Sequence, residues 1–300
     1  MLPRSTVLGF GVGAMLLLSG CPSVPPPKSA PPSPRALIDR MRATTACGAS
    51  LRATSKIDYF GDQGRIRVEL MMLAEKPASL RMDVVSPFGA TLATLTSDNS
   101  RFTLADFRNK QFLTGTAAPC NIARLTHLPI PGPVLVGLLR GNAPILKHED
   151  RNATFEWSGR GHYALTIRGA NDTVETLALE PHPDDRQKNW NEQRFRVKNV
   201  SMVQEGITLY TVELGDHRPV PLAKLEIGPE DALLGGGTQN PVAACDAELP
   251  RKMKFEIPTA GDDVLFRYDE IVWNPSISKE LFQQSPPAGM DVGVVDCERK

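Results

Sequence analysis

Apolar and polar side chains alternate along much of the chain. The segment 80–85 reads LRMDVV, in which every second side chain is apolar. Because successive side chains of a strand point to opposite faces, this period of two predicts a strand with one buried face. The next residues, 86–89, read SPFG, and their proline and glycine predict a turn. The turn places a large apolar ring, Phe88, at its tip.

The same alternation recurs before and after this segment. Short Gly-, Asn- or Pro-containing connections separate the alternating runs, as expected of an antiparallel meander. Further strands are expected at 51–60, 65–74, 90–97, 101–106 and 111–114, near Ile145, and at 153–157, 162–168, 173–180, 194–204, 207–214, 222–227, 252–257 and 264–273.

Helical spacing interrupts the strands at a few places. Ser33 followed by a proline predicts a helix start, and a helix running to about Ala46 is expected there. Residues 122–125 and 134–139 also have helical spacing, with the sequence LPIPGP between them. The pattern predicts a mainly β fold with short helices, namely a curved antiparallel sheet or incomplete β-barrel whose open side a helical lid covers.

The concave side of such a sheet is expected to be apolar, which suits a fatty acyl chain. The alternative for each of these side chains is an ordinary place in a solid core. Candidate cavity walls are Leu70, Met72, Leu80, Met82, Val84 and Leu95, and candidate lid contacts are Leu135, Leu138 and Leu139.

The first twenty residues have the features of an export signal. Arg4 gives a positive start, and an apolar run at 7–18 is too short to span a bilayer comfortably. The run ends in Leu-Ser-Gly-Cys, which resembles a bacterial lipobox, so residues 1–20 are predicted to be a lipoprotein signal peptide and Cys21 the lipidated residue. The alternative is a plain secretory signal. Pro22 follows the cysteine instead of the aspartate typical of inner-membrane retention, which favours the outer membrane.

The sequence after Cys21 is rich in proline. Residues 21–34 lack apolar periodicity and are predicted to form an extended tether that holds the folded part away from the membrane. Residues 35–300 are predicted to form a single half-barrel domain with an extended C-terminal part. A long loop is expected at 229–251, where three consecutive glycines occur, and the tail is expected to dock through Leu281 and Phe282.

Composition and motifs argue against several functions. The formal net charge is zero, which disfavours nucleic-acid binding because that requires a basic surface. Two fragments, SDN at 97–99 and SISK at 276–279, imitate penicillin-binding enzymes but occur in the wrong order. The polar clusters at 148–150 and 182–185 are interpreted as solvated loops. No enzyme activity, cofactor or metal site is therefore predicted.

The chain has five cysteines. If Cys21 carries lipid, the remaining even number in an exported protein predicts two disulfides among Cys47, Cys120, Cys245 and Cys297. Three pairings are possible. The pairs Cys47–Cys120 and Cys245–Cys297 are favoured, because the first would join the entry of the sheet to the lid and the second would join the long loop to the tail.

The segment 65–141 resembles LolB, the outer-membrane receptor for lipoproteins, and less closely its periplasmic partner LolA. The resemblance rests on Pro87-Phe88-Gly89, where the family has Pro-Leu-Gly, and on the sequence LPIP at 128–131 before a short helix that ends at Gly141. The lipobox and the polar tether ahead of the domain are the third shared feature. The chain is much longer than LolB after Gly141.

The resemblance implies an unclosed barrel with a helical lid, a cavity for acyl chains, and no catalysis. It also implies that Phe88 enters the membrane, whereas the residues alone are equally compatible with a ring that folds back onto the core. The expected partners are acylated lipoproteins, a LolA-like periplasmic donor, and the outer membrane, which the protein would face from the periplasm on its lipid anchor. The alternative function is that of a structural or scaffolding lipoprotein that binds another envelope protein.

Overall fold

The computed structural model describes residues 23–62, 64–220 and 247–297. The predicted signal peptide, Cys21, the predicted strand 222–227, most of the predicted loop 229–251 and Cys245 lie outside these ranges. The helices are α1 (Pro34–Thr44), α2 (Pro119–Thr126) and α3 (Gly132–Leu139), with short 3-10 turns η1 (Asp150–Asn152), η2 (Pro183–Asp185), η3 (Trp190–Glu192) and η4 (Lys279–Phe282).

The strands alternate with short connections. They are β1 (Ser50–Gly61), β2 (Gly64–Glu75), β3 (Ser79–Val85), β4 (Thr91–Asp98), β5 (Arg101–Asp106), β6 (Gln111–Thr116), β7 (Ala153–Trp157), β8 (Tyr163–Arg168), β9 (Thr173–Pro181), β10 (Phe195–Gln204), β11 (Ile207–Pro219), β12 (Glu248–Ile257), β13 (Asp262–Trp273) and β14 (Asp291–Val295).

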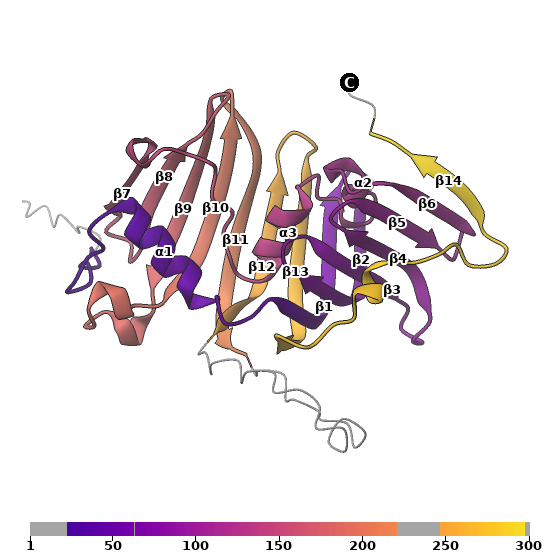
Figure 1. The fold of residues 1–300 in the computed structure, drawn as a ribbon, viewed down its shortest axis with the longest axis horizontal. Helices are drawn as coiled ribbons and strands as arrows, with labels where there is room; N and C mark the ends of the chain where they lie inside the picture. The colour runs from indigo at the N-terminus through magenta and orange to yellow at the C-terminus, as the bar shows by residue number, and fades with distance from the viewer. Residues whose placement is uncertain (1–22, 63, 221–246, 298–300) are drawn as a thin grey trace, which may run out of the picture.

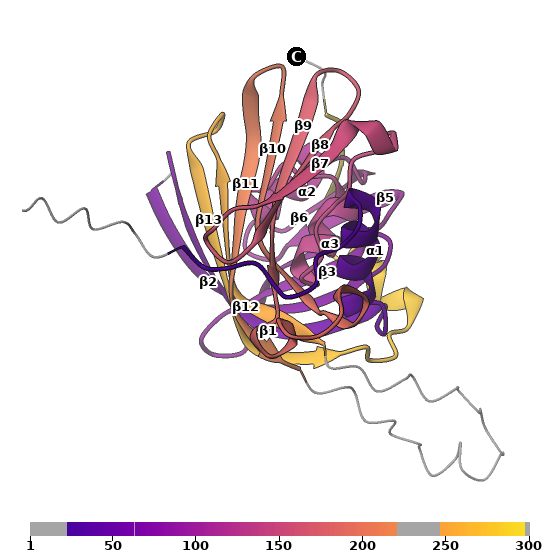
Figure 2. The ribbon, with the colours of Figure 1, turned by 90° about the vertical axis from the view of Figure 1, so that its left-hand side faces the viewer.

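All strands of the described residues belong to one sheet, in the order β14-β6-β5-β4-β3-β2-β1-β13-β12-β11-β10-β9-β8-β7. Neighbours are antiparallel except β14, which lies parallel to β6. The two halves of the sheet meet where β13 pairs with β1. The sheet is strongly curved (Figure 2). Its edge strands β14 and β7 do not pair with each other. The predicted fold class, a curved and unclosed antiparallel sheet with short helices, is confirmed.

The helices cover the concave side of the sheet (Figure 1). Helix α1 begins where it was predicted, because the Oγ of Ser33 accepts a hydrogen bond from the backbone N–H of Ala36 at 3.1 Å. Its buried face, Leu37, Ile38 and Met41, lies over the half of the sheet that contains β7 and β10. Helix α3 packs on β2 and β3 in the other half. No helix of the described ranges is long and apolar enough to cross a bilayer.

Several local expectations were wrong. Residues 143–149 form no strand around Ile145. Strand β12 begins at Glu248, so the end of the predicted loop 229–251 belongs to the sheet. In the tail, Phe282 is buried but Leu281 is exposed, so only one member of the predicted docking pair docks. Strand β14 was not predicted at all, because its short sequence, DVGVV, pairs with a strand that is remote in sequence.

The prolines before α1 do not stay clear of the domain. The backbone N–H of Val24 donates to the carbonyl of Gly159 at 2.9 Å, and the Nε1–H of Trp157 donates to the carbonyl of Val24 at 2.8 Å. Further along, the Nε2 of Gln193 donates to the carbonyl of Ser29 at 2.9 Å. The expectation of a free tether is therefore not met over residues 23–33, because donors around β7 and η3 satisfy the backbone carbonyls of this segment.

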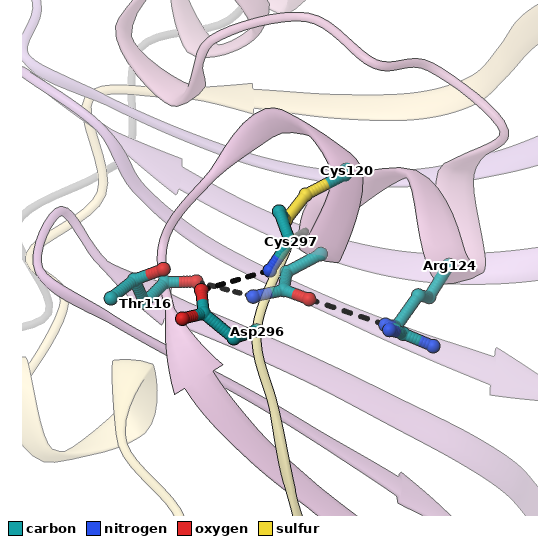
Figure 3. The surroundings of a disulfide bond; sticks show 6 residues. Thr116, Cys120, Arg124, Asp296 and Cys297 are labelled. Atoms are coloured by element: carbon teal, nitrogen blue, oxygen red, sulfur yellow. Dashed lines mark hydrogen bonds between the residues drawn. A yellow bond between two sulfur atoms is a disulfide. The ribbon is translucent and has the colours of Figure 1, made fainter. Parts of the chain in front are cut away.

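The disulfide pairing differs from the favoured one. Cys120, at the start of α2, is bonded to Cys297, which follows β14, and their Cα atoms are 6.2 Å apart (Figure 3). The pair Cys47–Cys120 is therefore wrong, and Cys297 is not available to Cys245. Cys47 is also disulfide-bonded. The physical reason is that the parallel pairing of β14 with β6 brings the end of the tail beside α2.

Candidate functional site

An apolar pocket of about 220 Å³ lies between the sheet and the end of α2. Its walls come from β1 to β4, and its rim includes residues of α2 and of the turn after β5. The lining residues are Ile57, Tyr59, Ile66, Val68, Leu70, Met82, Val84, Leu92, Ala93, Asp106, Arg108, Arg124, Leu125 and His127. Aliphatic side chains dominate the wall, so the pocket suits an apolar group.

The pocket contains only some of the residues proposed for a cavity. Leu70, Met82 and Val84 line it. The other candidates are buried in the core and do not line it, namely Met72, Leu80, Leu95, Leu135, Leu138 and Leu139. Helix α3 is almost entirely apolar and packs directly on β2 and β3, so its leucines fill that part of the concave side.

Sequence reasoning missed the rim of the pocket. His127 caps α2 in the left-handed conformation, at φ 57°, and its ring stacks on Tyr59. The hydroxyl of Tyr59 donates to Oδ1 of Asp262 at 2.7 Å, and this hydrogen bond, with burial, raises the pKa of Tyr59 to about 12. Burial lowers the pKa of His127 below its ordinary value. The only sequence signal for the rim was the position of His127 between a helix and a proline-rich run.

Phe88 lies outside the core. Its side chain is 97% exposed, although the turn that carries it is well defined. The N–H of Ser86 donates to the carbonyl of Ala90 at 2.8 Å, and the N–H of Gly89 donates to the carbonyl of Ser86 at 2.9 Å. Gly89 adopts φ 80°, which favours glycine. The alternative in which the ring folds back onto the core is therefore excluded.

Other apolar side chains are exposed near Phe88. The hairpins β1–β2, β3–β4 and β5–β6 turn at the same edge of the sheet, because β1 to β6 are successive antiparallel neighbours. Phe60 and Ile66 lie beside the first turn and Phe107 lies in the third, and they are 43%, 38% and 40% exposed. Neighbouring turns are two strand spacings, or about 10 Å, apart. We call the group formed by Phe60, Ile66, Phe88 and Phe107 the apolar edge. The pocket reaches the same edge through Ile66 and Arg108.

The fragments that imitate enzyme motifs do not form one site. Ser97 is buried in β4, whereas Ser276 and Lys279 are exposed in the tail. Within the described ranges, no group of three or more His, Cys, Asp or Glu side chains is arranged to hold a metal ion.

The cluster 182–185 is not the solvated loop that was predicted. Asp185 is fully buried, and the Nε of Arg194 donates to its Oδ2 at 2.7 Å. Burial acts to raise the pKa of Asp185, but the hydrogen bonds from Arg194 and Lys188 hold it well below its usual range. His182 contacts Glu248 at 3.1 Å, so the cluster fastens the loop between β9 and β10 to β12.

No family model matches the sequence, and no curated protein is similar to it in sequence. Solved structures are similar in fold. A LolA superfamily protein from Nitrosomonas europaea is 10% identical, covers 84% of this chain and 98% of its own, and has a TM-score of 0.47. A domain assigned to an outer membrane lipoprotein-sorting protein from Vibrio parahaemolyticus is 9% identical, covers 82% and 95%, and has a TM-score of 0.44.

A DUF1329 family protein from Desulfovibrio piger is 7% identical, covers 84% of this chain and 98% of its own, and has a TM-score of 0.50. At this identity the likeness concerns the fold alone. These comparisons report similarity of fold and assign neither a family nor a role to this chain. The curved, unclosed sheet with helices on its concave side agrees with the architecture that the sequence resemblance implied.

Proposed function

We propose that this protein is a lipid-anchored receptor that accepts the acyl chains of lipoproteins from a LolA-like periplasmic donor and assists their insertion into the outer membrane. The observation that carries the proposal is the position of Phe88. Its exposed ring lies at the same edge of the sheet as the apolar pocket. A receptor needs this arrangement, because the acyl chain must pass from the pocket into the bilayer without crossing water.

The proposed transfer needs no covalent step. Moving an acyl chain between apolar environments depends on differences in burial, and each methylene contributes about 0.8 kcal/mol. Phe88 would insert its apolar ring at the boundary between the headgroups and the acyl chains, where the apolar side chains of interfacial segments are buried. Phe60, Ile66 and Phe107 would increase the contact of the apolar edge with lipid.

The size of the pocket limits what it holds in this closed form. A cavity of about 150 Å³ binds one benzene molecule, and the pocket measures about 220 Å³. It therefore accepts the end of one acyl chain. Accepting a diacylglyceryl group would require α2 and residues 127–133 to move away from the sheet.

The second candidate is a scaffolding lipoprotein that binds another envelope protein. It is favoured by the six candidate cavity residues that lie in the solid core instead of lining a cavity. In that function the small pocket would hold no ligand, and the apolar edge would contact a protein surface.

Binding tests the receptor function first. The full chain with Cys21→Ser, exported to the periplasm and examined by native mass spectrometry, is expected to carry an acylated species. Ala93→Phe adds a ring inside the pocket and should abolish this species. Leu209→Phe, on the distant strand β11, is the matched control and should retain it. A bare mass and no uptake of an added lipopeptide would leave the scaffold as the better function.

Delivery tests the role of Phe88. Phe88→Glu should preserve uptake of the lipopeptide but reduce its transfer to liposomes at least tenfold, because the carboxylate resists entry into lipid. Ile207→Glu is the control, since Ile207 is an exposed apolar residue at a hairpin remote from the pocket. Equal transfer by both variants would contradict the proposed membrane contact.

A further inference from the structure

Two arginines from different elements meet at the rim of the apolar pocket. Arg108 lies in the turn after β5, and Arg124 lies on α2, yet both line the same small cavity. Both side chains are exposed to solvent. The pocket is thus apolar inside and cationic at its mouth.

Within the described residues, no acidic side chain forms an ion pair that neutralises Arg108 or Arg124. The Nε of Arg124 donates to the neutral amide oxygen of Asn121 at 3.2 Å, which leaves its terminal nitrogens available. Within the described part of the chain, neither arginine takes part in an ion pair. A guanidinium at a pocket mouth, with free donors, is suited to a planar or tetrahedral oxyanion.

The carboxylate at the rim is already occupied. Oδ1 of Asp106 accepts the backbone N–H groups of Arg108 and Asn109, both at 3.0 Å, and Oδ2 accepts the side-chain amide of Asn109 at 2.7 Å. Asp262 bonds to Tyr59 and does not line the pocket. Two arginines and one carboxylate therefore line the pocket, so the positive side chains outnumber the negative one.

We infer that the pocket selects a single-chain amphiphile with an anionic end group, either a carboxylate or a phosphate. The apolar chain would lie against the aliphatic side chains inside the pocket. The anion would stay at the mouth between Arg108 and Arg124, because burying a charge without partners is costly. The inference rests on the proposed binding of an acyl chain in the pocket and goes beyond the proposed function, because the ester- and amide-linked chains of a lipoprotein carry no anionic end group, whereas a free fatty acid or a single-chain phosphate lipid does. It adds that the end group of the ligand contributes to affinity, so the ligand is more than an apolar tail.

Ligands of equal chain length but different end groups distinguish a pocket that prefers an anion from a pocket that binds any apolar chain. The exported full chain with Cys21→Ser would be titrated calorimetrically with decanoate, decyl phosphate and decan-1-ol at pH 7.5, each below its aggregation concentration. We expect either or both anions to bind at least tenfold more tightly than the alcohol. The better of the two identifies a fatty acid or a phospholipid-type source. Equal affinity for all three would overturn the anion preference while preserving the acyl pocket, and no binding of any of them would overturn both.

Substitutions of the two arginines test whether they cause the preference for an anionic end group. Arg108→Gln combined with Arg124→Gln should reduce the affinity for the preferred anion at least tenfold and leave that for decan-1-ol within twofold. Arg101→Gln is the matched control, because Arg101 is exposed at the opposite end of β5 and does not line the pocket. A similar loss for the alcohol, or for the Arg101 variant, would contradict a specific role of the two arginines.

Discussion

The ring of His127 stacks on the ring of Tyr59, with centroids 3.9 Å apart and planes inclined by 23°. His127 ends α2, and Tyr59 belongs to β1 and is hydrogen-bonded to Asp262 of β13. The stack therefore fastens the end of the helix to the junction between the two halves of the sheet. Because both rings line the pocket, the stack also forms part of its closure.

Loosening this stack should ease entry into the pocket. His127→Asn removes the ring but keeps a residue that tolerates the left-handed backbone. We expect a fluorescent fatty-acid probe to enter several-fold faster in stopped-flow measurements. Tyr59→Phe is the control, since it keeps the stacking ring and loses only the bond to Asp262. An unchanged entry rate in the His127 variant would show that the chain enters elsewhere.

The exposed ring of Phe88 should contribute little to folding. Phe88→Ser is expected to change the free energy of unfolding in urea by less than about 0.5 kcal/mol. Phe282→Ser, at a phenylalanine only 2% exposed, should cost about 3 kcal/mol or more. A large loss of stability in the Phe88 variant would mean that the ring serves the fold and was not retained for contact with a membrane or partner.

Glu175 predicts a decline of stability between about pH 4.5 and about pH 7. It is fully buried in β9, where Oε2 accepts the N–H of Leu146 at 2.9 Å, and burial raises its pKa to about 7. The folded state then holds a proton that the unfolded state has lost, so stability falls as pH rises from about 4.5 to about 7 and stays low above it.

Replacing Glu175 should remove this dependence. Glu175→Gln keeps an acceptor for Leu146 and should raise the free energy of unfolding at pH 8 by up to about 3 kcal/mol, with little effect near pH 4. Urea titrations at both pH values provide the measurement. Equal stability of variant and parent at pH 8 would show that the carboxylate is compensated when ionised.

The disulfide between Cys120 and Cys297 closes a loop of 177 residues. Replacing both cysteines with serine leaves no unpaired thiol from this bond. The variant should lose roughly 2–5 kcal/mol of stability, because the unfolded chain regains freedom. Hydrogen exchange should accelerate specifically in β14. Unchanged exchange there would show that pairing with β6 holds the strand without the covalent bond.

The docked proline-rich segment should resist proteolysis. Trp157→Phe removes the donor to the carbonyl of Val24 and keeps an aromatic ring. Trypsin cleavage after Lys28, which is exposed, should then accelerate. Trp190→Phe is the matched control, because it is the backbone N–H of Trp190 that donates to Ser29. Equal cleavage of both variants and the parent would argue that the Trp157 bond does not hold the segment.

Local patterns in the sequence predicted most strands and all three helices of the described residues. Alternation at 80–85 and the spacing of Leu37, Ile38 and Met41 reflect which face of an element is buried, and this depends on nearby residues alone. Patterns of this kind do not identify partners that are distant in the chain. Val24 bonds to Trp157, 133 residues away, and no periodicity in either segment records that contact.

In the candidate site, too, local features could be predicted from the sequence and contacts between distant segments could not. The turn that carries Phe88 could be predicted because turn chemistry is local, but the residues alone left open whether its ring is exposed or folds back onto the core. The extent of the pocket could not be predicted, since it depends on how closely α3 approaches β2 and β3. The leucines of α3 are equally suited to a core and to a cavity wall, and only their packing distinguishes the two.

For a lipid-anchored chain, the docked segment would also determine how far the domain can travel from the membrane attachment. If Cys21 carries lipid, only Pro22 separates it from the docked residues beside the β7–β8 turn. Phe88 lies at the opposite ends of the strands, and the β3–β4 turn that carries it is nine strand spacings from the β7–β8 turn in the sheet order, or roughly 43 Å along the curve. Released, residues 23–33 would extend by about 34 Å. For a chain anchored at Cys21, docking would keep the domain close to the anchor, and release would lengthen its reach by most of the distance that separates the β7–β8 turn from Phe88.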